Sequence, residues 1–138
     1  MVDRLPPPDP VPLAPFAAVF ADPGFAFGSW GGGGSTDGVV EMPYFQLSAE
    51  AGAFVQAAYA AHWVRPDIDW STFAGSEAYR SLRDDPARVA MADTDLLARM
   101  LTMLIRGDRF SEGLLAAAFA DGTLPAIARR MAVLAEQA

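Results

Sequence analysis

The feature that most constrains the fold is a segment in the second half of the chain that is apolar around most of its helical circumference. The helix opens at Asp93, and its large apolar residues are Leu96, Leu97, Met100, Leu101, Met103, Leu104 and Ile105. Its polar stripe consists of Asp95, Arg99, Thr102 and Arg106. A helix that is apolar on nearly every side must be surrounded by other elements. The segment therefore predicts a central helix.

Helical periodicity also appears on both sides of this segment. Ser48 is a good N-cap for a helix that ends by Trp63, because Pro66 restricts the residue before it. Ser111 and Thr123 are expected to cap the last two helices, with Gly122 ending the first of them. The expected helices span residues 15–22, 48–63, about 73–83, a short stretch after Asp85, 93–106, 111–122 and 123 onward.

A β-hairpin is predicted in the N-terminal third. Residues 25–30 alternate aromatic and small side chains, and residues 39–47 are rich in β-formers. The glycine-rich stretch 31–38 between them predicts a long flexible tip, and Pro43 places the second strand at an edge or gives it a bulge. The expected fold class is α+β, mainly helical, with an N-terminal β-hairpin packed on a bundle of about five helices.

Proline concentrates at the start of the chain. Seven of the 11 prolines fall in the first 23 residues, where each fixes φ and removes an amide donor. We therefore expect residues 1–12 to form a disordered proline-rich arm that can be removed without loss of stability. A chain of 138 residues suits one domain, so residues 13–138 are expected to form a single globular domain.

Several kinds of chemistry are excluded by composition. The chain has no cysteine, no lysine and a single histidine, His62, which excludes disulfides, thiolate catalysis, lysine Schiff bases and a phosphate-loop lysine. We expect no catalytic residues, no cofactor and no metal site. The net charge of −7 makes nucleic acid an unfavourable partner. With neither a signal-peptide pattern nor an apolar run of about 20 residues, the chain is expected to be cytoplasmic and to have no membrane partner.

One segment resembles a known family. It runs from Arg106 to Gly122 and reads Arg-Gly-Asp-Arg-Phe-Ser-Glu-Gly before a small-residue helix. This Arg-x-Asp-Arg-Phe-x-Glu-Gly motif resembles that of a family of small bacterial proteins of unknown function, as does the segment Met-Pro-Tyr-Phe at residues 42–45. The resemblance covers about residues 16–136. Ser111 stands where the family has a cysteine, and the resemblance implies no reaction.

The charged residues of this motif are the main candidate site, comprising Arg106, Asp108, Arg109 and Glu112. Their arginines could grip a carboxylate or phosphate, as in an anion-binding or acid/base site. Alternatively, the four side chains form a structural network of ion pairs that fixes the turn between two helices. The second interpretation predicts that Asp108→Ala unfolds much of the protein.

Weaker candidates have plainer structural interpretations. Asp67 and Asp69 could hold a cation, but Asp69 suits a helix N-cap better. His62 could be a general base, but its place near a helix end favours a capping or packing role. The remaining candidates are a phosphate-binding loop at 31–38 and an aromatic pocket between hairpin and bundle, lined by Trp30, Tyr44, Phe45, Trp63 and Trp70.

No set of residues in the sequence has the spacing of a known catalytic site. We therefore predict a small soluble bacterial protein that acts as a binding or interaction module. The alternative is a small enzyme or a protein that binds an anionic ligand through Arg106, Asp108, Arg109 and Glu112. The hairpin has strand edges with few partners, so we also expect a homodimer, formed through that edge or through the alanine-rich helices. Neither a protein partner nor a small anion can be identified from the sequence.

Overall fold

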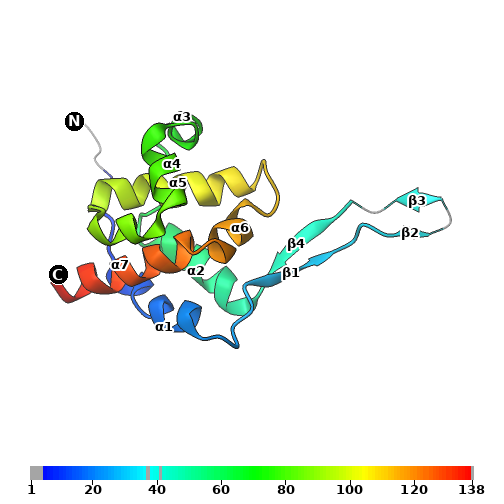
Figure 1. The fold of residues 1–138 in the computed structure, drawn as a ribbon, viewed down its shortest axis with the longest axis horizontal. Helices are drawn as coiled ribbons and strands as arrows, with labels where there is room; N and C mark the ends of the chain where they lie inside the picture. The colour runs from blue at the N-terminus through cyan, green and yellow to red at the C-terminus, as the bar shows by residue number, and fades with distance from the viewer. Residues whose placement is uncertain (1–4, 37, 41, 138) are drawn as a thin grey trace.

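A computed structural model describes residues 5–36, 38–40 and 42–137. The described residues form a mainly helical α+β domain, which confirms the expected class (Figure 1). The α-helices are α1 (Phe16–Ala21), α2 (Ala49–Ala60), α3 (Trp70–Ala74), α4 (Glu77–Asp84), α5 (Thr94–Asp108), α6 (Leu114–Ala120) and α7 (Thr123–Gln137). Two 3-10 helices, η1 (Val11–Leu13) and η2 (Pro86–Met91), and the strands β1 (Gly28–Gly31), β2 (Ser35–Thr36), β3 (Val39–Val40) and β4 (Tyr44–Leu47) complete the set.

Helix α5 is the centre of the domain, as predicted. Its residues from Leu97 to Ile105 are buried, apart from Arg99. Thr102 belongs to this buried set although it lies on the polar stripe. Its hydroxyl donates to the carbonyl of Trp63 at 3.1 Å and accepts from the amide of Arg65 at 3.0 Å. Thr102 thus ties the loop after α2 to the central helix.

An aromatic cluster joins α1, α2, α6 and the start of the hairpin. The ring of Phe20 lies 5.1 Å from Phe54 and 5.5 Å from both Phe25 and Phe119, centroid to centroid. Phe27 stacks on Phe119 at 4.9 Å. Offset and edge-on ring pairs of this kind are favourable beyond the area they bury. The cluster holds the root of the hairpin against the helices.

The hairpin is shorter and more interrupted than predicted. β1 pairs antiparallel with β4, from Gly28 opposite Leu47 to Gly31 opposite Tyr44, and β2 pairs with β3 further out. The expected strand over 39–47 is broken at residues 42 and 43, where Pro43 lacks the amide that a ladder needs. Beyond its root the hairpin projects away from the helices (Figure 1).

Residues 5–12, which belong to the expected disordered arm, make hydrogen bonds to the end of α2 and the loop after it. The amide of Asp9 donates to the carbonyl of Ala61 at 3.0 Å, and the indole Nε1 of Trp63 donates to the carbonyl of Asp9 at 2.7 Å. Arg65 donates to the carbonyl of Pro6 at 3.0 Å, and Leu13, just beyond the arm, is fully buried. Proline removes amide donors but leaves carbonyl acceptors, and these hold the arm on the end of α2. Residues 1–4 lie outside the described residues.

Several helix boundaries also differ from the prediction. The helix expected over 73–83 is divided into α3 and α4, and the hydroxyl of Ser76 caps α4 by accepting from the amide of Tyr79 at 3.2 Å. Ser111 does not cap α6, because the N-cap is Gly113. At α7 the carboxylate of Asp121 accepts from the amide of Thr123 at 2.9 Å, so Asp121 does the capping expected of Thr123.

Candidate functional site

The turn between α5 and α6, residues 109–113, carries most of the predicted motif. It faces two features of the molecule, the hairpin and a pocket among the helices. Asp108, the last residue of α5, fixes the turn from within, because its carboxylate accepts from the amide of Leu115 at 3.0 Å. Glu112 reaches outward, and its carboxylate accepts from the amide of Phe45 in β4 at 2.7 Å.

The four charged residues of the motif do not form the predicted network of ion pairs. Within the described ranges, no salt bridge joins Arg106 or Arg109 to Asp108 or Glu112. Both carboxylates accept from backbone amides instead. Arg109 and Glu112 are exposed, while Arg106 and Asp108 are half-buried. The two carboxylates of the motif therefore bind backbone amides, and in this way they position the hairpin and α6.

Gly113 provides the second attachment of the hairpin. Its φ is +89°, a left-handed conformation that side chains disfavour. A Cβ atom at this position would lie 2.7 Å from the indole ring of Trp30 in β1. Glycine is therefore required twice over, for the backbone angle and for the close approach of the tryptophan.

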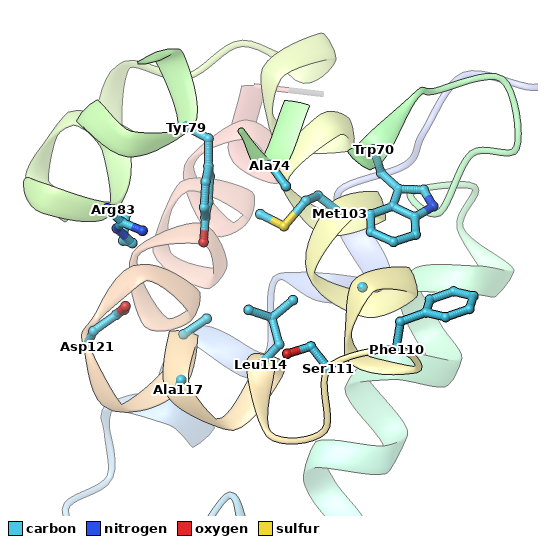
Figure 2. Close-up of a pocket in the computed structure, with 12 residues that line it drawn as sticks. Trp70, Ala74, Tyr79, Arg83, Met103, Phe110, Ser111, Leu114, Ala117 and Asp121 are labelled. Carbon is cyan, nitrogen blue, oxygen red and sulfur yellow. The ribbon is translucent and has the colours of Figure 1, made fainter. Parts of the chain in front are cut away.

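On its other side the turn borders a pocket among α3, α4, α5 and α6, with a volume of about 380 Å³. We call it the α3–α6 pocket. Figure 2 shows the side chains that surround it. They are Trp70, Ala74, Tyr79, Arg83, Met103, Gly107, Phe110, Ser111, Leu114, Ala117, Ala118 and Asp121.

One end of the α3–α6 pocket is apolar and aromatic. The ring of Trp70 stacks on Phe110 with a centroid separation of 5.7 Å and an interplanar angle of 21°. Phe110 itself is 80% exposed, so it forms an open apolar rim. Gly107 allows this wall to form, since a Cβ atom there would lie 2.8 Å from Leu114 Cδ2 and 3.5 Å from the Trp70 ring. Small residues on the facing helices, such as Ala117, leave the space open.

The other end of the pocket is polar. The hydroxyl of Tyr79 points towards the space between Arg83 and Asp121 (Figure 2). Burial raises the pKa of Tyr79, and the negative charge of Asp121 adds to this effect while Arg83 opposes it. The phenol therefore stays neutral at physiological pH and can donate a hydrogen bond. In the part of the chain that the structure describes, that hydroxyl has no hydrogen-bond partner of its own.

The weaker candidates take structural roles in the residues described. Asp69 caps α3, where its carboxylate accepts from the amide of Thr72 at 3.2 Å, and the bonds from Thr72 and Ser71 lower its pKa. Asp67 forms a salt bridge with Arg65 at 3.6 Å. Across the described ranges no three His, Cys, Asp or Glu side chains gather in a way that could hold a metal ion.

His62 ends α2 through its backbone. Its φ is +67°, its amide donates to the carbonyl of Tyr59 at 3.2 Å, and the next amide, of Trp63, donates to Ala58 at 2.9 Å. This pair of hydrogen bonds forms a Schellman motif, in which glycine usually takes the left-handed position. The imidazole is exposed and carries no part of the pocket.

The five aromatic residues expected to line one pocket are separated in the fold. Trp63 is fully buried and Tyr44 is half exposed on the hairpin. Trp30 and Phe45 line a more open hollow against α6. Of the five, Trp70 lines the α3–α6 pocket. The rest of the pocket carries no signal in the sequence, because each of four helices contributes only two or three residues to its walls.

Comparison with known proteins identifies a family. The chain matches the family of unknown function DUF6508 over residues 6–137. No curated protein and no solved structure matches it. No helix among the described residues has the length and apolar character needed to cross a membrane. The chain belongs to the DUF6508 family, and the predicted motif lies within the matched range.

Proposed function

We propose that this member of the DUF6508 family is a binding protein whose α3–α6 pocket takes a small, largely apolar molecule. The observation that carries the proposal is a pocket with an aromatic wall at one end and polar side chains gathered at the other. Ligand sites in proteins have this composition, since apolar walls supply affinity and a few polar groups fix orientation. A volume of about 380 Å³ falls within the range of such sites.

The exposed rim supports this proposal. Protein interiors are close-packed, and a domain that needed no ligand would gain by closing such a space. Phe110 and Trp70 instead keep their stacked rings at the mouth of the pocket, where Phe110 is 80% exposed. Apolar surface held in this way is typical of binding sites.

The alternative of an anion site or a small enzyme at Arg106, Asp108, Arg109 and Glu112 has weaker support. Asp108 and Glu112 already accept hydrogen bonds from Leu115 and Phe45, so neither carboxylate is kept for a substrate. The arginines on this segment stay available to an anion. That hypothesis stays a prediction, which phosphate titration of Arg106→Gln and Arg109→Gln variants would test.

The proposed function can be tested with a purely apolar probe. Toluene is titrated into the ¹⁵N-labelled protein, and we expect amide shifts at Ala74, Gly107 and Ser111, which line the pocket. Ala117→Leu should fill the pocket and weaken these shifts about tenfold or more. Ala60→Leu, the same change at an exposed position of α2, is the matched control and should bind like wild type. Shifts spread evenly over the surface, or equal in both variants, would contradict the proposal.

A second candidate function is self-association through the hairpin. Val39, Val40 and Met42 are 66%, 72% and 80% exposed on its outer part. In each two-stranded sheet every strand has one free edge, and such edges are usually paired or covered. We propose a second copy of the chain as the occupant, because two copies related by a twofold axis can bury the same exposed side chains of Val39, Val40 and Met42 against each other.

Sedimentation of the wild type and a Val39→Ser, Val40→Ser double variant would test the dimer. We expect a concentration-dependent dimer for the wild type and a monomer for the variant. A wild-type monomer at every concentration would contradict this second proposal and leave the pocket untouched.

A further inference from the structure

We infer that the α3–α6 pocket selects electrically neutral molecules that join a small apolar ring to one group able both to donate and to accept hydrogen bonds, of which a primary carboxamide is the simplest. This inference rests on the proposed function and names its ligand class. It is carried by the opposite charges that face each other at the polar end of the pocket.

Arg83 on α4 and Asp121 after α6 border this polar end, and the hydroxyl of Tyr79 lies beside them (Figure 2). Asp121 raises the pKa of the Tyr79 hydroxyl and Arg83 lowers it, which fits their places beside this hydroxyl in the pocket wall. The sum of the two charges is zero. A carboxylate ligand would be attracted by Arg83 and repelled by Asp121, and an ammonium ligand would meet the reverse, so neither gains the full benefit of its partner.

The hydrogen-bonding capacity left at this end matches an amide. Arg83 uses its Nε atom on Asp84 at 3.4 Å, and its Nη atoms have no partner among the described residues. Asp121 uses Oδ1 on the amide of Thr123, so its second oxygen can accept. A carboxamide oxygen can accept from Arg83 or Tyr79 while its NH₂ group donates to Asp121. A purely apolar molecule would make no hydrogen bond to any of these groups, so it should bind more weakly than the amide.

The apolar end sets the size and shape of the rest of the ligand. The stacked rings of Trp70 and Phe110 offer flat surfaces, and Leu114 and Met103 close the space between them and Tyr79 (Figure 2). About 380 Å³ is at the low end for ligand pockets. One planar ring with a short polar group therefore suits the cavity.

Three compounds of the same shape test the inference: benzamide, benzoate and benzylamine. At pH 7 they are neutral, anionic and cationic, and each joins one benzene ring to one polar group. Titrations followed by amide shifts at Gly107 and Ser111 should show benzamide binding roughly tenfold tighter than either ion. Benzoate or benzylamine binding as tightly as benzamide would overturn the inference while leaving a ligand pocket. If toluene and all three compounds fail to bind, the proposed function fails as well.

Two substitutions should then change which of the two charged compounds binds more tightly. Arg83→Gln leaves Asp121 as the remaining charge at the polar end, so benzylamine should gain over benzamide by about tenfold. Asp121→Asn leaves Arg83, so benzoate should gain by a similar factor. Asn can still accept from the amide of Thr123, and both positions are exposed, so the fold is retained.

A matched control lies on the same helix. Arg80 is an exposed arginine of α4 that does not line the pocket, and Arg80→Gln makes the same change in net charge as Arg83→Gln. It should leave the order of the three compounds unchanged. An equal shift in the Arg80 and Arg83 variants would mean that the overall charge of the protein, rather than the pocket, decides the selectivity, and would overturn the inference.

Discussion

The helices and the hairpin hold their structure in different ways. Most residues of α5 are buried on every side, whereas β1, β3 and β4 contain no buried residue. A two-stranded ribbon is marginal in water without a surface to pack on. The hairpin takes that support at its root, from the aromatic cluster, from Glu112 and from Gly113. Stability should therefore decrease along the hairpin from its root to its outer part.

The largest effect is expected when an aromatic ring that contacts both the helices and the root of the hairpin is removed. Phe20 contacts Phe25 and Phe27 before β1 as well as Phe54 in α2 and Phe119 in α6. Phe20→Ala should destabilise the protein by about 3–5 kcal/mol, because it leaves a cavity where the two regions meet. Chemical denaturation measures this, and a loss under about 1 kcal/mol would mean that the root is held without the cluster.

Deletion of the N-terminal arm tests whether the arm contributes to the stability of the helical region. Deleting residues 1–12 removes the carbonyl of Asp9 and leaves the indole Nε1 of the buried Trp63 without its partner. We expect a loss of about 2 kcal/mol, since an unsatisfied buried donor costs about 1–3 kcal/mol. Thermal melting of the truncated and full chains checks this. Equal melting temperatures would restore the expectation of a removable arm.

Asp108→Ala tests the turn that joins the two regions. The carboxylate caps the backbone of α6 instead of pairing with an arginine, so the expected loss is about 1 kcal/mol rather than the about 3–5 kcal/mol of a broken buried ion pair. Asp108→Asn keeps an acceptor oxygen and should lose less. A loss near the higher value would mean that Arg106 or Arg109 depends on this carboxylate after all.

The smallest effect is expected on the outer hairpin. Val40 is 72% exposed in β3, so Val40→Ala should change the free energy of unfolding by less than about 0.5 kcal/mol. Measured at low concentration, this value applies to the monomer. A larger loss there, growing with protein concentration, would show that a second chain covers this surface.

Local patterns predicted the elements whose reasons lie within a few residues. The apolar circumference of α5, the Ser48 cap of α2 and the Asp69 cap of α3 could all be read from the sequence. The break of the second strand at Pro43 could be anticipated only as an edge or a bulge. In each case the deciding contact lies close by in the chain.

Long-range contacts set what the sequence could not predict. The arm docks because Trp63, 54 residues away, needs an acceptor for its indole. Glu112 is committed to Phe45 across 67 residues, which no motif spacing reveals. The α3–α6 pocket depends on which helices face one another, and a pattern of small residues such as Ala74, Gly107 and Ala117 does not say so. The charged motif was visible in the sequence, but its backbone partners were not.

The attachment of the hairpin to the turn after α5 has a consequence for the order of folding. During synthesis, residues 28–47 emerge well before Glu112, Gly113 and Phe119, on which the root of the hairpin rests. Closing so long a loop is slow compared with forming local helices. The strands therefore lack the part of their docking surface that the turn after α5 and α6 supply until those segments have assembled around α5. Until then their unpaired backbone edges and exposed apolar side chains stay open to neighbouring chains, so the nascent protein is most prone to aggregation before residues 112–119 are made.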